Sequence, residues 1–116
     1  MYLELLDALL KSVRGAEAAL LLDAEGEVVV EAGPKHERHR LIGAYQGLVL
    51  AKVTQVNERY ELGKLDYLLR RHDGGTVVLR PLKDGYYFVV ALADGTPIGP
   101  CLYQSARTQE RLNEEL

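Results

Sequence analysis

The residues that could perform chemistry are few, and they are spread along a chain of 116 residues. His36 and His39 are three positions apart, a spacing that could place two imidazoles side by side on a helix as metal ligands. No cysteine, carboxylate or further histidine stands at a spacing that completes such a site. His72 adjoins two arginines at the end of an expected strand. We interpret all three histidines as surface residues and expect no metal ion and no cofactor.

The candidate nucleophile and acid–base groups are also isolated. Cys101 would need an activating base and an electropositive pocket, so we expect an inert, half-buried thiol. The carboxylate pairs Asp23/Glu25 and Glu114/Glu115 stand on an expected turn and at the end of the chain, where solvation explains them. No phosphate-binding loop, dinucleotide-binding glycine pattern, nucleophile elbow or Cys-x-x-Cys pair occurs. The sequence therefore predicts a protein that is not an enzyme.

The composition excludes several further classes of function. The 17 acidic and 14 basic residues give a net charge of −3, and the arginines form no run, so we expect no nucleic-acid partner. A single cysteine favours a reducing cytoplasm. The first 15 residues carry Glu4 and Asp7 among leucines, unlike a signal peptide, and no apolar run approaches the ~20 residues of a membrane span. We expect one cytoplasmic domain, residues 1–116, without membrane insertion.

The periodicity of apolar residues predicts eight elements in the order α-β-β-α-β-β-β-α. The last strand is apolar without alternation, which is typical of a strand covered on both faces. The sequence thus predicts an α+β fold, with five antiparallel strands and helices on both faces. The expected helices are 2–13, 37–60 and one with Pro100 in its first turn, and the expected strands are 18–23, 27–32, 64–72, 76–82 and 86–93.

The expected helix 37–60 has two contrasting faces. We expect the larger residues at spacings of three and four to face the core, namely Ile42, Tyr45, Val49, Val53, Val56 and Tyr60. The opposite face then carries Gly43, Ala44, Gly47, Ala51 and Thr54. A glycine inside a helix costs about 1 kcal/mol relative to alanine, so we interpret this face as a contact with a second copy of the helix. The alternative is that the glycines are simply tolerated.

The expected strand 64–72 has charged residues on both faces, including Lys64, Asp66 and Arg70, with Leu68 between them. Such a strand can protect a sheet edge from aggregation. It can equally pair with its symmetry mate in a dimer, where charge pairs fix the register. Both interpretations remain open at the level of the strand itself.

Three segments taken in order resemble the Roadblock / dynein light chain domain. They are GAEAALLLDAEGEVV, HRLIGAYQGLV and GGTVVLRPLKDGYYFVVALADGTPIG, and with the leading helix they span nearly the whole chain. The resemblance implies a five-stranded antiparallel sheet with the long helix on one face and the terminal helices on the other. It also implies a homodimer in which the third strands pair and the long helices lie antiparallel.

The resemblance further implies a function in regulating or scaffolding small Ras-like GTPases. Bacterial gliding and polarity members of this family act as GTPase-activating partners, whereas others are subunits of dynein or of lysosomal scaffolds. No catalytic residue is transferred. We expect a homodimeric regulator whose exposed polar residues bind a Ras-like GTPase, namely Arg40, Gln46, Lys52, Gln55 and Glu58. The alternatives are a structural adaptor without effect on nucleotide turnover and, less favoured, a small-molecule sensor.

Overall fold

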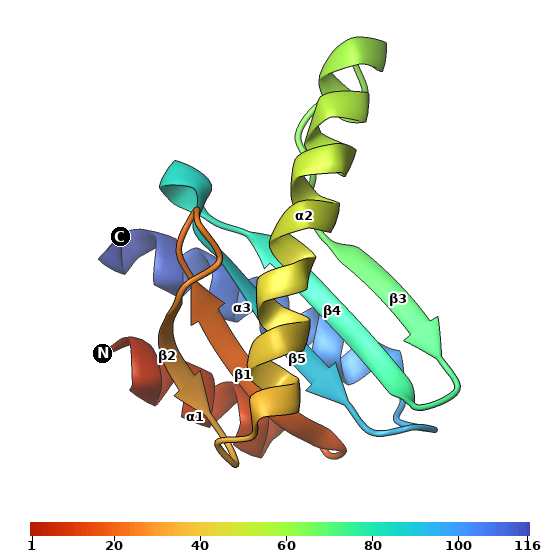
Figure 1. The fold of residues 1–116 in the computed structure, drawn as a ribbon. Helices are drawn as coiled ribbons and strands as arrows, with labels where there is room; N and C mark the ends of the chain where they lie inside the picture. The colour runs from red at the N-terminus through yellow and green to blue at the C-terminus, as the bar shows by residue number, and fades with distance from the viewer.

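The computed structural model describes residues 1–116 and contains three helices and a five-stranded antiparallel sheet in the expected order (Figure 1). The α+β fold class is therefore confirmed, and the long helix has the expected bounds. The elements are α1 (Tyr2–Ser12), β1 (Ala16–Leu22), β2 (Val28–Ala32), α2 (Glu37–Tyr60), β3 (Leu68–His72), β4 (Gly75–Pro81), β5 (Tyr87–Leu92) and α3 (Ile98–Glu115), with a 3₁₀ turn at Lys83–Gly85 between β4 and β5.

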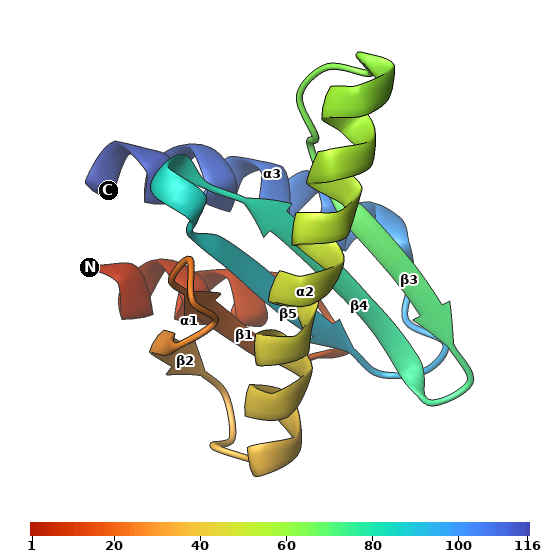
Figure 2. The same ribbon diagram turned by 45° about the horizontal axis from the view of Figure 1, so that its top comes forward.

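The strands are arranged in the order β2-β1-β5-β4-β3, so β5 is the central strand and β2 and β3 form the two edges. All six residues of β5 are buried, which explains why its sequence is apolar without alternation. In Figure 2, α2 lies on one face of the sheet while α1 and α3 lie on the other. The helix arrangement implied by the family resemblance is thus confirmed.

The two faces of the sheet carry separate cores. The larger core contains Ala19, Val78 and Phe88 of the sheet and is covered by α1 and α3. The smaller core contains Leu20, Leu22, Leu79, Tyr87 and Val89, with Ile42 and Leu50 of α2 packed against it. The α2 layer is therefore held by fewer apolar contacts than the opposite layer.

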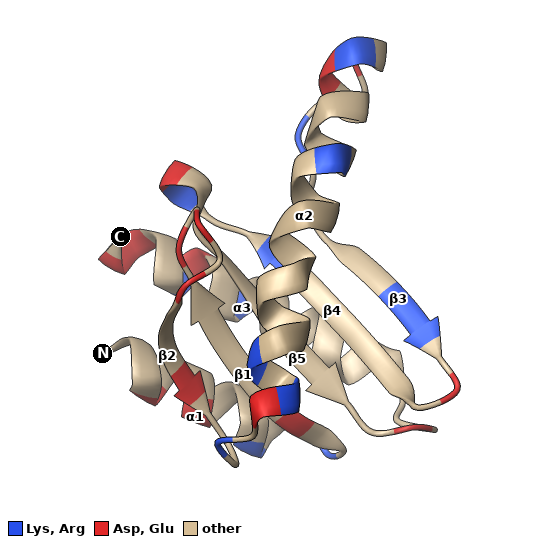
Figure 3. Cartoon of the chain, viewed as in Figure 1, with Lys and Arg blue, Asp and Glu red and all other residues tan.

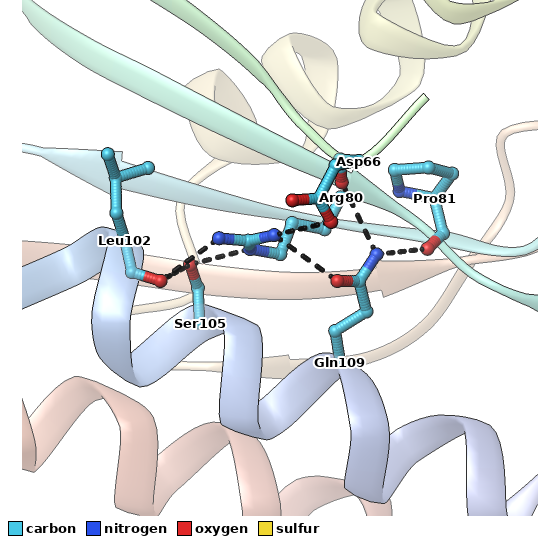
Figure 4. A network of polar contacts seen from close by, with 6 residues as sticks. All are labelled: Asp66, Arg80, Pro81, Leu102, Ser105 and Gln109. Atoms are coloured by element: carbon cyan, nitrogen blue, oxygen red, sulfur yellow. Dashed lines mark hydrogen bonds and ion pairs between the residues drawn. The ribbon is translucent and has the colours of Figure 1, made fainter. Parts of the chain in front are cut away.

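Strand β3 is shorter than expected, because Asp66 and Tyr67, just before it, contact a buried arginine instead of pairing in the sheet. Arg80 is 2% exposed, and its Nη1 atom donates to Asp66 Oδ1 at 3.2 Å. Its other donors reach Ser105 Oγ and the carbonyl oxygen of Leu102, and Gln109 accepts a further bond (Figure 4). Arg80 also lies over the Tyr67 ring, 4.9 Å from its centroid. The chain between α2 and β3 is thereby fastened to the α3 side of the sheet.

Helix α2 begins and ends with specific caps. The Nδ1 atom of His36 accepts a hydrogen bond from the backbone N–H of Arg38 at 3.0 Å. At the other end Glu61 adopts the left-handed conformation with φ of 54°, and the N–H of Leu62 donates to the carbonyl oxygen of Asn57. The second half of the helix extends beyond the sheet (Figure 1).

Candidate interaction surface on α2 and β3

The orientation of α2 differs from the sequence expectation. Gly43 and Gly47 face the sheet: a Cβ atom at Gly43 would lie 3.3 Å from a Leu22 methyl, and one at Gly47 would lie 2.7 Å from the Tyr87 hydroxyl oxygen. The expectation that both glycines point away from the core is therefore wrong. They are small because the sheet approaches them, and no second helix is needed to explain their presence.

The large side chains of the sheet are the physical reason for this orientation. Tyr87 is 1% exposed and donates a hydrogen bond from its hydroxyl to the Gly43 carbonyl oxygen at 3.0 Å. Burial raises the pKa of Tyr87 above its ordinary value. Because Tyr87 and Leu22 already fill the space between sheet and helix, only small residues fit at the closest points of α2.

Three of the six residues expected to form the core side of α2 are exposed. Tyr45 is 62% exposed, Val56 50% and Tyr60 66%, whereas Ile42, Val49 and Val53 are half-buried. Two further residues missed by the sequence reasoning are exposed as well, Leu41 at 50% and Leu48 at 66%. We call Leu41, Tyr45, Leu48, Val56 and Tyr60 the apolar stripe, since at 100° per residue they share an arc of about 120°.

The apolar stripe has a signal in the sequence that was available but not used. Leu41, Tyr45 and Leu48 follow a spacing of four and three, the same helical periodicity as the pattern that was assigned to the core. Two overlapping apolar patterns therefore exist on this helix. Sequence periodicity could not decide which of them faces the sheet.

Strand β3 supplies the second part of the surface. It pairs only with β4, so its other edge has free backbone donors and acceptors. Leu68 and Arg70 lie opposite Leu79 and Val77 of the α2-side core, and thus point toward the α2 side of the sheet. Arg71, the next residue, points to the other face. The free edge and the α2 layer therefore present one surface.

The expected partner-binding residues are divided by the structure. Lys52, Gln55 and Glu58 are exposed on α2, as expected. Gln46 is only 4% exposed, so its expected exposure is wrong, because it lies on the side of α2 that faces the sheet. Arg40 is exposed but forms an ion pair with Glu31 of β2 at 2.6 Å. Only part of the expected set is thus free to contact a partner.

The expected dimer-contact residues are likewise distributed over different environments. Ala44 and Ala51 are exposed beside the Leu48 edge of the apolar stripe, Thr54 is exposed further round the helix, and Ala44 lies near the β1–β2 turn at Gly26. Lys64 and Asp66 are exposed but precede β3, whereas Leu68 and Arg70 are half-buried within it. These residues therefore do not form one continuous patch.

A groove of about 660 Å³ lies between the first turns of α2 and the β3–β4 hairpin. Thr76 and Val77 of β4 and Ala91 and Leu92 of β5 also line it. All three histidines of the chain border this groove together with Arg38 and Arg70. The sequence reasoning kept His72 apart from His36 and His39, because it predicted the two strands of the hairpin but not that the hairpin lies beside the start of α2.

The isolated reactive groups acquire no chemical partner in the fold. Cys101 is buried, and burial raises the pKa of its thiol to about 11, against a smaller lowering by the charge of Arg80. A buried, protonated thiol does not act as a nucleophile. No group of three histidine, cysteine or carboxylate side chains is arranged to hold a metal ion. None of the three helices has the length and apolar composition to cross a bilayer.

The chain belongs to the Roadblock/LC7 domain family, whose sequence model matches residues 2–92. Its fold is similar to that of MglB from Myxococcus xanthus, with a TM-score of 0.88, 13% identity, and coverage of 98% of this chain and 93% of that one. The gliding protein MglB from Thermus thermophilus gives a TM-score of 0.85, 18% identity and coverages of 99% and 90%.

A third similar structure is an MglB with a tetrameric arrangement, with a TM-score of 0.86, 17% identity, and coverage of 97% of this chain and 85% of that chain. No functionally curated protein matches the chain in sequence. At these identities the structural similarity shows the fold alone. The fold similarity and the family membership agree with the resemblance inferred from the sequence.

Proposed function

We propose that this protein is a homodimeric, non-enzymatic regulator that binds a small Ras-like GTPase. The observation that supports the proposal is an apolar stripe, half or more exposed at each residue, beside a free strand edge. Exposed apolar residues gathered on one helix face are typical of a protein-binding surface. Cys101 is buried, and its raised thiol pKa makes it a poor nucleophile, which supports a binding protein rather than an enzyme.

We expect the apolar stripe and the free edge of β3 to bind a second copy of the chain. In a two-fold dimer the same surface meets itself, so antiparallel α2 helices would bury the apolar stripe against its symmetry mate. The free edge of β3 lies on the same side and would pair with its own mate. Because α2 extends beyond its own sheet, its second half would reach over the partner (Figure 1). One interface would then cover both unpartnered features.

The GTPase would bind the polar surface that remains exposed around the paired helices. Gln55 and Glu58 are exposed on α2 outside the arc of the apolar stripe and are the expected residues best placed to contact it, whereas Lys52 lies within that arc and would be covered by the second copy (Figure 3 shows the charged positions of α2). The proposed regulator changes the conformation of the GTPase by binding and supplies no catalytic residue.

The dimer is tested by Leu48→Arg, which puts a charge into the apolar stripe. Sedimentation is expected to show dimer for the wild type and a shift to monomer for this variant. Thr54→Arg is the matched control, because Thr54 is exposed on the same helix and, at 100° per residue, lies about 120° from either end of the stripe. Dimers of equal strength in both variants would contradict the proposed interface.

The GTPase function is tested with Ras-like GTPases encoded in the same genome, loaded with GDP or a GTP analogue. We expect binding to one nucleotide state and a changed rate of GTP hydrolysis. Binding without a change in rate would indicate a structural adaptor. Absence of both binding and rate change with every candidate would contradict the proposal.

A further inference from the structure

The groove beneath the start of α2 is lined by an unusual set of side chains for a protein of net charge −3. Arg38, Arg70 and three imidazoles border it, and Glu17 and Glu37 are the carboxylates at its margin. The three ion pairs of the chain are Met1–Glu4, Arg40–Glu31 and Arg80–Asp66. Neither arginine of the groove is therefore neutralised by a carboxylate of the chain.

Two nitrogen atoms of this set are buried and lack a hydrogen-bond partner, Nε of Arg70 and Nδ1 of His39. Buried polar groups in folded proteins are almost always hydrogen-bonded. Elsewhere in this chain the rule is obeyed by a comparable group, since Arg80 is more deeply buried and its guanidinium has four hydrogen bonds. The Nε–H of Arg70 is thus a donor for which the protein provides no acceptor, and the Nδ1 atom of His39 is likewise unpaired.

We propose that this groove is a binding site for a phosphate group. Arginine presents several N–H donors in a planar arrangement that matches phosphate oxygens, and histidine adds a donor that gains charge near neutral pH. A phosphate in the groove would accept from Arg70 and His39, and Arg38 closes the site from α2. The site consists of residues of one chain, but Leu41 and Tyr45 of the apolar stripe also line the groove, so the second copy in the proposed dimer would border the site.

The volume allows two sources of the phosphate group. A groove of about 660 Å³ falls within the range of small-molecule sites, roughly 300–1,000 Å³, and exceeds what a free phosphate ion fills. The group is therefore either the free ion or the phosphate of a larger ester. Inorganic phosphate and AMP serve as probes for the two cases.

The decisive experiment is a chemical-shift titration of the full chain with inorganic phosphate at constant ionic strength, using chloride as the balancing anion. Arg70→Gln is expected to weaken binding roughly tenfold or more, because it removes a charge-assisted hydrogen bond. Arg71→Gln is the matched control and is expected to bind like the wild type. It removes the same charge from the same strand, but from the opposite face of the sheet.

Histidine protonation provides a second readout. Phosphate itself gains a proton as the pH falls from about 8 to about 6, so the readout is the difference between the wild type and His39→Gln titrated at the same pH. An imidazole that gains a proton near neutral pH adds charge beside Arg38 and Arg70, so the wild type is expected to lose less affinity than the variant as the pH falls. Glu17 and Glu37 border the same groove and are unchanged in the variant, and thermal melting shows that each variant is folded.

Three outcomes would overturn the proposal. They are the absence of a saturable shift with either probe, equal weakening by Arg70→Gln and Arg71→Gln, and shifts that do not involve the groove residues. Saturable binding that depends on Arg70 supports it. Tighter binding of AMP than of phosphate assigns the site to a phosphate ester, and the reverse order assigns it to the free ion.

Discussion

Replacing Gly47 by alanine distinguishes the orientation of α2 in the structure, with Gly47 toward the sheet, from the opposite orientation expected from the sequence. The two orientations predict effects of opposite sign on the free energy of unfolding. If Gly47 faced solvent, the substitution would raise the free energy of unfolding by about 1 kcal/mol, because alanine is the better helix former. In the structure, however, the added Cβ would lie 2.7 Å from the Tyr87 hydroxyl oxygen and 3.4 Å from the adjoining ring carbon. The first distance is shorter than van der Waals contact, so either the tyrosine or the helix must move.

The magnitude follows from three contributions. Overpacking a buried site costs about 1–3 kcal/mol. Displacement of Tyr87 also weakens its hydrogen bond to the Gly43 carbonyl oxygen, which contributes about 0.5–1.5 kcal/mol. The gain in helix propensity offsets about 1 kcal/mol. We therefore expect Gly47→Ala to lower the free energy of unfolding by about 0.5–3.5 kcal/mol.

Urea unfolding monitored by circular dichroism measures this change, and two variants serve as controls. Gly99→Ala makes the same substitution at an exposed position of α3 where no atom lies within 4 Å, so it should not be destabilising. Tyr87→Phe removes the clashing hydroxyl, so Gly47→Ala should cost less in that background than in the wild type. Stabilisation by Gly47→Ala in the wild type would refute the orientation of α2 described above.

Three further predictions concern single sites. Arg80→Met should lower the free energy of unfolding by about 2–4 kcal/mol in urea titrations, because it leaves buried Ser105 and its neighbours without their hydrogen-bond partner. The control Asp66→Asn should change the free energy of unfolding by less than about 0.5 kcal/mol, because the Asp66 side chain is 75% exposed. Glu61→Gly should raise the melting temperature, equivalent to about 0.5–1 kcal/mol, because glycine adopts the left-handed conformation of this helix cap without strain. Cys101 should resist thiol reagents at pH 8 until the protein unfolds. Because burial raises the pKa of its thiol from 9.0 to about 11, the native state keeps a proton that the unfolded chain loses between these values. The free energy of unfolding should therefore fall as the pH rises above about 9.

The fold was predictable because each element has its own local signal. Helix α2 has the expected bounds, and the unbroken apolar run of β5 indicated correctly that both of its faces are covered. Strand β3 was expected to be longer, because no local pattern indicates that Arg80, fourteen residues after Asp66, holds that residue outside the sheet.

The surface was less predictable because it depends on contacts between distant parts of the chain. The side of α2 that meets the sheet is decided by the size of Tyr87, which is 44 positions from the Gly43 carbonyl it contacts. The groove likewise requires the β3–β4 hairpin to bring Arg70 and His72 to the start of α2. Periodicity along one helix contains no information about the size of the side chains that it will meet.

The extension of α2 beyond the sheet has a consequence for local dynamics. Among residues 51–60 only Val53 and Asn57 are even half-buried, so these turns depend mainly on their own backbone hydrogen bonds. Helical segments without tertiary packing open readily, and their amide hydrogens exchange with solvent far faster than those of a core strand. A protein that covers this segment would slow the exchange without altering the rest of the fold. Amide exchange rates at the end of α2 would therefore report directly on whether the chain is alone or bound.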